Sequence, residues 1–211
     1  MRWVELVWGS AFLAVAVACA FGCASFRGYR LGAVPPFSQV QVPAPLSSIT
    51  LVVASKGTVN GKEKDIPEKL IERWATPTLR AYKESRYFSG VEKGLSPSDV
   101  RAEITITDAG EGSQAGAFFA GLTLLVIPAA GTDVMTTQTS FKDRDGNDLG
   151  TIEKTEAMNS WIGLLLIFAM PFAWPGSVLD EIVYDLNRAT LVEAAERGWL
   201  TVRPVEPAVS P

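Results

Sequence analysis

Residues 100–107 read VRAEITIT, and this stretch decides the fold class. Every second residue from Val100 to Ile106 is apolar, whereas the residues between them are charged or carry a hydroxyl group. A period of two places the apolar side chains on one face of a β-strand and the polar side chains on the other. The sequence therefore predicts a half-buried strand here, in a sheet that packs against other elements.

Two predicted elements precede this strand. Residues 49–54 read ITLVVA, a short, β-branched and continuously apolar run that is typical of a strand covered on both faces. An approximate helical stripe from Leu70 to Tyr82 predicts a helix, and Pro77 within it should kink the helix or split it in two. The folded domain is thus expected to begin near residue 48.

Three predicted elements follow. Residues 133–142 and 149–158 are rich in Thr and predict two strands, joined by a tight hairpin turn at Asp145–Gly146. An apolar stripe from Val178 to Val192 predicts a final helix. The order β-α-β-β-β-α predicts an α+β domain over residues 48–200, with its helices packed on one face of the sheet.

The composition excludes several function classes. The chain has 211 residues, 47% of them hydrophobic, and its 19 basic and 23 acidic residues give a net charge of −4. One compact core is expected at this length, and no overall basic field favours nucleic acid. Histidine is absent, and the two cysteines are Cys19 and Cys23. The body of the chain therefore lacks the groups for Ser-His, Cys-His or His-metal chemistry, and we do not expect an enzyme.

The first residues have the layout of a secretory signal peptide. Arg2 precedes an uncharged run from Val7 to Gly22, and small residues gather at the end of that run. Such a signal consists of a basic start, an apolar middle and a cleavage site with small residues. An uncleaved membrane anchor is the alternative, because the apolar run is nearly long enough to span a bilayer.

The end of this run resembles the lipobox of bacterial lipoproteins. Ala20-Phe21-Gly22-Cys23 carries the resemblance, although the family favours Leu three residues before the cysteine and a small residue two before it. The resemblance implies a signal peptide at 1–22 and a diacylglycerol and acyl chain on Cys23, with Cys19 as the alternative lipidation site.

The resemblance also implies a location. In lipoproteins of the common Gram-negative type, Asp directly after the lipidated cysteine marks retention in the inner membrane, and this chain has Ala24 there. The expected location is the cell envelope, anchored in the outer membrane and facing the periplasm. Residues 23–47, with four prolines, predict an extended tether, and a flexible tail is expected at 201–211.

Two long segments carry no charge at all. They are residues 112–132 and 157–179, and their central apolar stretches predict short helices that are too short to cross a bilayer. In an antiparallel meander, the connections at these positions leave the sheet at the same end. We therefore expect both segments to lie side by side at one pole of the domain.

The aromatic residues of these segments favour a membrane interface. The candidate residues for membrane or oligomer contact are Phe118, Phe119, Leu122, Leu124, Leu125, Trp161, Ile162, Leu164, Leu165, Phe168, Phe172 and Trp174. Burial in a soluble core and a two-pass hairpin in the inner membrane are the alternatives. The expected partner is membrane lipid. If the segments form an oligomer interface instead, the partner is a second copy of the chain or another envelope protein.

No other segment predicts a ligand site. The acidic turn at 143–148 fails the spacing of a calcium loop and reads as a hairpin turn. The glycines from Gly110 to Gly121 lack the Lys-Ser/Thr of a phosphate loop, so neither a metal nor a cofactor is expected.

The whole arrangement resembles the small Gram-negative envelope lipoproteins with a compact α+β domain. A more distant likeness, in element order, is to the curli-secretion channel lipoproteins, which project membrane segments from sheet strands and assemble into a ring. The sequence thus predicts a non-enzymatic envelope lipoprotein with a second membrane contact or oligomer interface. The alternative is a soluble periplasmic domain that binds a ligand or partner and is tethered by lipid alone.

Overall fold

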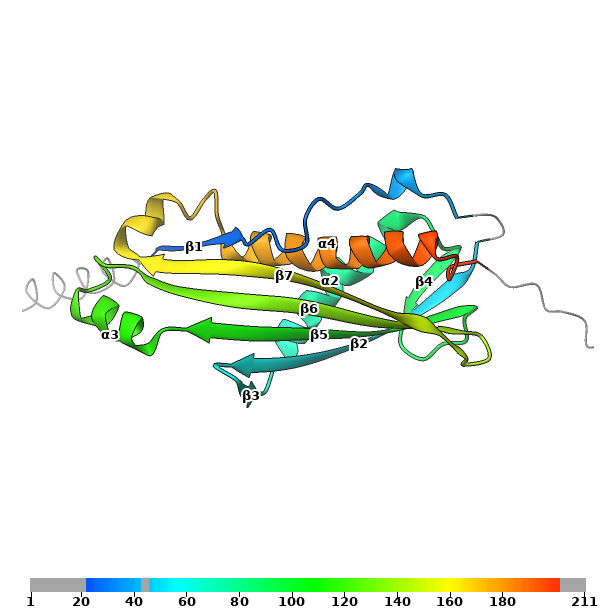
Figure 1. Cartoon of the computed structure of the whole chain (residues 1–211), viewed down its shortest axis with the longest axis horizontal. Coiled ribbons are helices and arrows are strands. Elements are labelled where there is room, and N and C mark those ends of the chain that lie inside the picture. The colour runs from blue at the N-terminus through cyan, green and yellow to red at the C-terminus, as the bar shows by residue number, and fades with distance from the viewer. Residues whose placement is uncertain (1–21, 43–45, 202–211) are drawn as a thin grey trace, which may run out of the picture.

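The computed structural model describes residues 22–42 and 46–201 (Figure 1). Residues 1–21, with Cys19 and most of the expected signal peptide, and the tail from 202 lie outside the described residues. The elements in chain order are β1 (Gly22–Arg27), η1 (Phe37–Gln39), β2 (Ser48–Val59), β3 (Lys62–Lys64), α2 (Glu68–Ser85), β4 (Gly90–Lys93), β5 (Val100–Gly112), α3 (Gln114–Leu122), β6 (Ala129–Asp143), β7 (Asp148–Gly163), η2 (Leu164–Phe168) and α4 (Pro175–Glu196).

The fold is α+β, as the sequence predicts, with a mixed seven-stranded sheet. The strand order is β1-β7-β6-β5-β2-β3, and β4 also pairs with β2. Strands β2 and β5 are parallel and are connected through α2, whereas β5, β6 and β7 form an antiparallel meander. The short strands β1, β3 and β4 were not predicted.

The core lies between the sheet and the two long helices. Both α2 and α4 lie behind the sheet in the view of Figure 1, on the same face. The alternation in β5 buries Ile104 and Ile106, which belong to one cluster with Trp74 and Tyr82 of α2. Leu186 of α4 joins the same cluster. Burial of these large side chains is the main source of stability, at roughly 1.5–3 kcal/mol each.

Of the kink or split expected at Pro77, the split does not occur, because helix α2 continues through the proline. Pro77 removes one backbone donor from the helix. The helix nevertheless keeps an apolar face against the core, because Trp74 and Ala81 on either side of the proline are buried. Tertiary packing thus outweighs the local cost of the proline.

Residues 23–42 of the segment expected to form an extended tether (23–47) lie along the domain. It begins as strand β1 and continues past α4 to the opposite end of the sheet, where β2 starts (Figure 1). Leu31 and Val40 pack against the core cluster, and the Tyr87 hydroxyl donates to the Phe37 carbonyl at 2.8 Å. Leu31, Phe37 and Val40 thus contact the folded domain.

Gly150 near the start of β7 is required by its surroundings. Its φ is +139°, and a Cβ added there would lie 2.4 Å from Cη2 of Trp199. Because φ is unfavourable and the indole ring must move, we expect Gly150→Ala to lower the free energy of unfolding by about 2–4 kcal/mol. Chemical denaturation measures the change. The matched control is Gly90→Ala, whose added Cβ meets nothing within 4 Å, and equal losses in both variants would contradict this explanation.

Candidate functional site

The antiparallel meander brings the two uncharged segments to the same end of the sheet. Gly112 at the end of β5 pairs with Gly131, and Ala129 at the start of β6 pairs with Ile162 near the end of β7. Beyond the strands, the Leu164 amide donates to the Leu125 carbonyl at 2.9 Å. Residues 114–128 and 161–174 together are called the apolar pole below.

The segments differ from the expected pair of short helices. Helix α3 covers Gln114–Leu122 in the first segment, and the remainder of that segment is a turn and the beginning of β6. The second segment continues strand β7 to Gly163 and then forms the short helix η2. Trp161 and Ile162 are strand-favouring residues that pair with β6, and this pairing replaces helix at the start of the segment.

Local interactions shape the first segment. The Ser113 hydroxyl caps α3 by accepting a hydrogen bond from the Gly116 amide at 3.0 Å. After the helix, Leu124 and Leu125 both have positive φ, at +49° and +60°. Such a conformation is uncommon for leucine and costs roughly 1–2 kcal/mol per residue. The Leu125 amide donates to the Ala120 carbonyl at 2.7 Å, which offsets part of this cost.

A glycine lets the second segment approach the first. An added Cβ at Gly163 would lie 3.0 Å from Cβ of Pro128 and 3.5 Å from the Leu125 carbonyl oxygen. A larger side chain would therefore push η2 away from the turn that follows α3. The absence of a side chain at Gly163 thus allows the two halves of the apolar pole to pack closely together.

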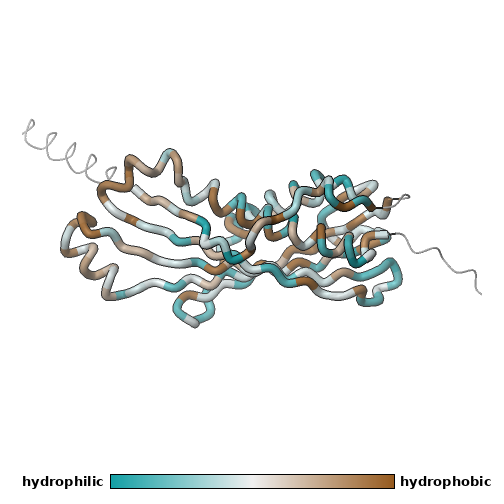
Figure 2. The backbone as a smooth tube through the Cα atoms, turned by 45° about the horizontal axis from the view of Figure 1, so that its top comes forward, coloured by the Kyte–Doolittle hydropathy of each residue, from teal (hydrophilic) through white to brown (hydrophobic). Residues whose placement is uncertain are grey.

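Large apolar side chains at this pole are exposed. Figure 2 shows that hydrophobic residues gather in the loops at one end of the molecule. Twelve of the sixteen large exposed apolar side chains among the described residues belong to the pole, and Phe172 is 92% exposed. The twelve are Phe118, Phe119, Leu122, Leu124, Val126, Ile127, Trp161, Ile162, Leu165, Phe168, Phe172 and Trp174.

Ten of the candidate contact residues are thus exposed at the pole, and two are not. Leu125 and Leu164 are half-buried, because they form the backbone contact between the two segments. Val126 and Ile127 are exposed at the pole but were missed by the sequence analysis. They lie within the same uncharged run as Leu124 and Leu125, so the absence of charge is the signal that could have found them.

Cys23 lies beside the apolar pole. It is the second residue of β1, and it pairs with Ile162 across the β1–β7 ladder. The cysteine is free and half-exposed, and partial burial raises the pKa of its thiol. The expected lipidation site and the exposed apolar side chains are therefore at the same end of the domain.

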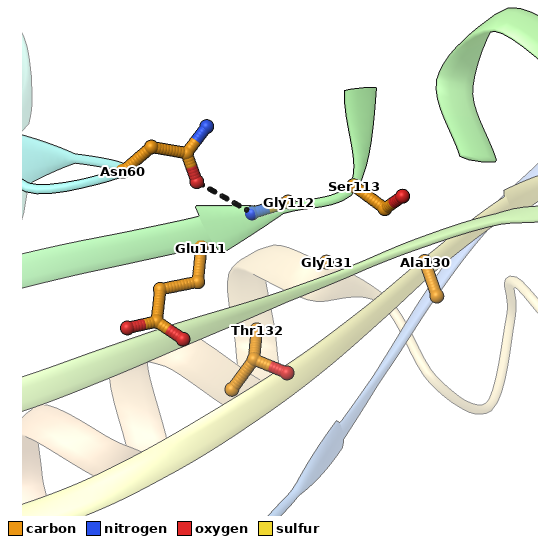
Figure 3. Close-up of a pocket in the computed structure, with 7 residues that line it drawn as sticks. All are labelled: Asn60, Glu111, Gly112, Ser113, Ala130, Gly131 and Thr132. Atoms are coloured by element: carbon orange, nitrogen blue, oxygen red, sulfur yellow. Dashed lines mark hydrogen bonds between the residues drawn. The ribbon is translucent and has the colours of Figure 1, made fainter. Parts of the chain in front are cut away.

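A polar hollow of about 520 Å³ lies next to the pole, where β5 ends and β6 begins. Figure 3 shows its lining, which consists of Asn60, Glu111, Gly112, Ser113, Ala130, Gly131 and Thr132. The Asn60 side-chain oxygen accepts a hydrogen bond from the Gly112 amide at 3.1 Å. The hollow offers hydroxyl groups and one carboxylate but no basic side chain. Across residues 22–42 and 46–201, no group of three His, Cys, Asp or Glu residues is placed to hold a metal ion.

Two carboxylates are half-buried on the strands that lead to the pole. Burial and the charge of Asp133 raise the pKa of Asp108 to about 6, against a smaller opposing effect of Lys64. Burial likewise raises the pKa of Asp133. Within the described part of the chain, Oδ1 of Asp108 is buried and has no hydrogen-bond partner. A negative charge on both Asp108 and Asp133 at once is therefore unfavourable.

The described helices include none with both the length and the apolar character needed to cross a membrane. The pole consists of strand ends, a nine-residue helix and the five-residue η2.

Comparison with known proteins places the chain in no family. No protein-family model matches it, and no curated protein matches it. Among solved structures, it is similar to a PelC dodecamer from Paraburkholderia phytofirmans, with a TM-score of 0.34 and 10% sequence identity. That match covers 87% of this chain and 99% of the other chain. A likeness of this strength assigns neither family nor function.

Proposed function

We propose that this chain is an envelope lipoprotein, anchored through Cys23 on the periplasmic side of the outer membrane, whose apolar pole makes a second contact with the bilayer. The observation that carries the proposal is the concentration of exposed apolar side chains at one end of the sheet. Monomeric soluble proteins rarely expose a contiguous apolar patch of this kind unless it binds a partner or a membrane.

The composition of the pole supports lipid as the occupant. Residues 112–132 and 157–179 contain no charged side chain, so insertion would not bury an ionised group. Trp161 and Trp174 stand at the two ends of the second half of the pole, and tryptophan is enriched at membrane–water interfaces. If the twelve exposed side chains each contribute about 1 kcal/mol, transfer into lipid is favourable by on the order of 10 kcal/mol.

The position of Cys23 favours the membrane over a protein partner. Acyl chains on this residue would begin beside Ile162, which is itself an exposed residue of the pole. A lipid anchor at this position brings the pole to the bilayer surface without any rearrangement of the domain. A single weak membrane contact gains stability when it is joined to a second one.

The soluble alternative requires the uncharged segments to be internal. Phe168 and Phe172 are 78% and 92% exposed, and their neighbours Leu165 and Trp174 are exposed as well. A domain tethered by lipid alone would leave these side chains in water. The same surface would suit a second copy of the chain, and the experiment below separates these occupants.

The test is membrane partitioning of the chain without its lipid. Residues 24–211 are exported behind an ordinary cleavable signal, and the envelope fraction is washed with carbonate. We expect the protein to remain with the membranes, because the pole alone holds it there. Release as a detergent-free monomer would contradict the proposal, and release as a dimer or ring would make a second copy the occupant of the pole.

A further inference from the structure

A partly buried cluster of charges joins strand β1 to the rest of the domain. Nη1 of Arg27 donates to the Asp185 carboxylate of α4 at 2.6 Å, and Nη2 donates to the Glu156 carboxylate of β7 at 3.3 Å. The side chain of Glu156 is only 1% exposed, and that of Arg27 is 20% exposed. Asp185 also pairs with Arg188 at 2.9 Å. One arginine of β1 thus connects a strand and a helix that are distant in the sequence.

The Glu156 carboxylate also fixes the backbone after β1. Its Oε1 accepts hydrogen bonds from the Arg30 amide and the Ala157 amide, both at 2.8 Å. The Gly28 amide donates to the Ala157 carbonyl at 2.7 Å. On the other side of β1, the Ser25 amide donates to the Ala173 carbonyl at 2.9 Å. Strand β1 is therefore held from three directions.

These contacts set the register of a strand with little intrinsic preference for sheet. The sequence of β1 is GCASFR, in which Gly, Ala and Ser favour strands weakly. A one-residue slip would move Arg27 away from Glu156 and Asp185 and leave the buried Glu156 carboxylate without its arginine. Breaking a buried ion pair in this way is strongly destabilising. The charge cluster therefore specifies that Cys23 lies opposite Ile162.

We infer that Arg27, Glu156 and Asp185 form an anchor latch, which holds the lipid-bearing residue against the apolar pole so that acyl chains and pole enter the same leaflet. This inference rests on the proposed function. It makes Glu156 and Arg27 positioning residues for the membrane contact. Because β7 has 16 residues, the far hairpin stands about 50 Å from the pole at the rise of an extended strand.

The first test measures whether the latch holds β1. The lipidated protein in detergent micelles is compared with Glu156→Gln by hydrogen exchange of the amides from Cys23 to Arg30. We expect exchange there to become at least about tenfold faster in the variant, while β5 and β6 keep their protection. The matched control is Lys142→Gln, which breaks the pair of Lys142 with Glu103 at 2.8 Å on partly exposed side chains. The control should not change exchange in β1.

A double variant shows whether charge pairing is the cause. Arg27→Met together with Glu156→Gln removes both partners of one pair, and Asp185 keeps Arg188. Because Arg27→Met alone leaves the buried Glu156 carboxylate without its arginine, the double variant should exchange more slowly in β1 than Arg27→Met alone. Fast exchange of β1 in the unchanged protein, or no difference between Glu156→Gln and Lys142→Gln, would overturn the inference. Neither outcome depends on a membrane, so the proposed function would stand.

The second test measures the effect on the pole. In the lipidated chain, an environment-sensitive fluorophore on Leu122→Cys reports whether the pole is inserted. The chain also carries Phe168→Ser and Phe172→Ser, which weaken insertion of the pole. Adding Glu156→Gln should lower the ratio of inserted to free pole in phospholipid vesicles by about tenfold, because a loose tether replaces a fixed placement. Adding Lys142→Gln should leave that ratio unchanged. An unchanged ratio with Glu156→Gln would show that the cluster stabilises β1 without positioning the anchor.

Discussion

Replacement of Phe118, Phe168 and Phe172 with serine is expected to weaken binding of residues 24–211 to phospholipid vesicles by about 100-fold or more. All three rings are exposed, and they belong to both halves of the pole. Because they contribute little to the core, the triple variant should keep its thermal midpoint. Vesicle flotation or a fluorescence titration gives the ratio of the two dissociation constants.

The control for this variant is a similar exposed apolar residue outside the pole. Leu95 is 76% exposed and precedes β5, at a distance in the sequence from both uncharged segments. Leu95→Ser should leave vesicle binding unchanged. An equal loss of binding in Leu95→Ser, or full binding in the triple variant, would show that lipid is attracted by something other than the pole.

Replacement of Asp108 with asparagine is expected to stabilise the fold at neutral pH but not in acid. The folded state raises the pKa of Asp108 from 3.8 to about 6, so it binds the proton more tightly than the unfolded chain. The contribution of this group to stability is therefore complete below about pH 4 and is lost as the pH rises to about 6. Above that pH, Asp108→Asn should gain about 1–2 kcal/mol, allowing for the partial exposure of the side chain.

Chemical denaturation of both proteins at pH 4, 6 and 8 measures this difference. The gain should be near zero at pH 4 and should reach its plateau near pH 7. Asp133→Asn should produce a gain of the same sign, because removal of its charge relieves Asp108. A difference that is independent of pH would mean that Asp108 is not the titrating group.

The sequence predicted the parts of the fold that depend on local pattern. The alternation from Val100 to Ile106 and the apolar run at 49–54 correspond to β5 and β2, and the helical stripes correspond to α2 and α4. Apolar periodicity has a direct physical cause, since one face of each element is buried against the same core. Strand ends were less predictable, and both β6 and β7 extend farther toward the pole than expected.

The sequence could not predict strand β1. Its residues have weak strand preference, and prolines follow it within ten residues. The interactions that hold it come from Glu156 and Asp185, more than 120 residues away in the chain. Likewise, the raised pKa of Asp108 depends on the neighbouring strand. Contacts of this range leave no local signal in a single sequence.

The candidate site was predictable in composition but not in shape. The two uncharged runs identified ten residues that are exposed at the pole, because both runs leave the antiparallel meander at the same end of the sheet. The half-buried positions of Leu125 and Leu164 depend on the hydrogen bond between the two segments. That bond follows from Gly163 and from the left-handed turn at Leu124, which the sequence pattern does not reveal.

The most direct test of the central claim is the depth of two fluorophores in a bilayer. Residues 24–211 contain no cysteine, so Leu165→Cys at the pole and Asp145→Cys at the far hairpin each provide a single labelling site. Vesicles that contain lipids brominated along their acyl chains should quench the label at position 165 and leave the label at position 145 unchanged. Equal fluorescence of both labels with and without bromine would contradict entry of the pole into the membrane.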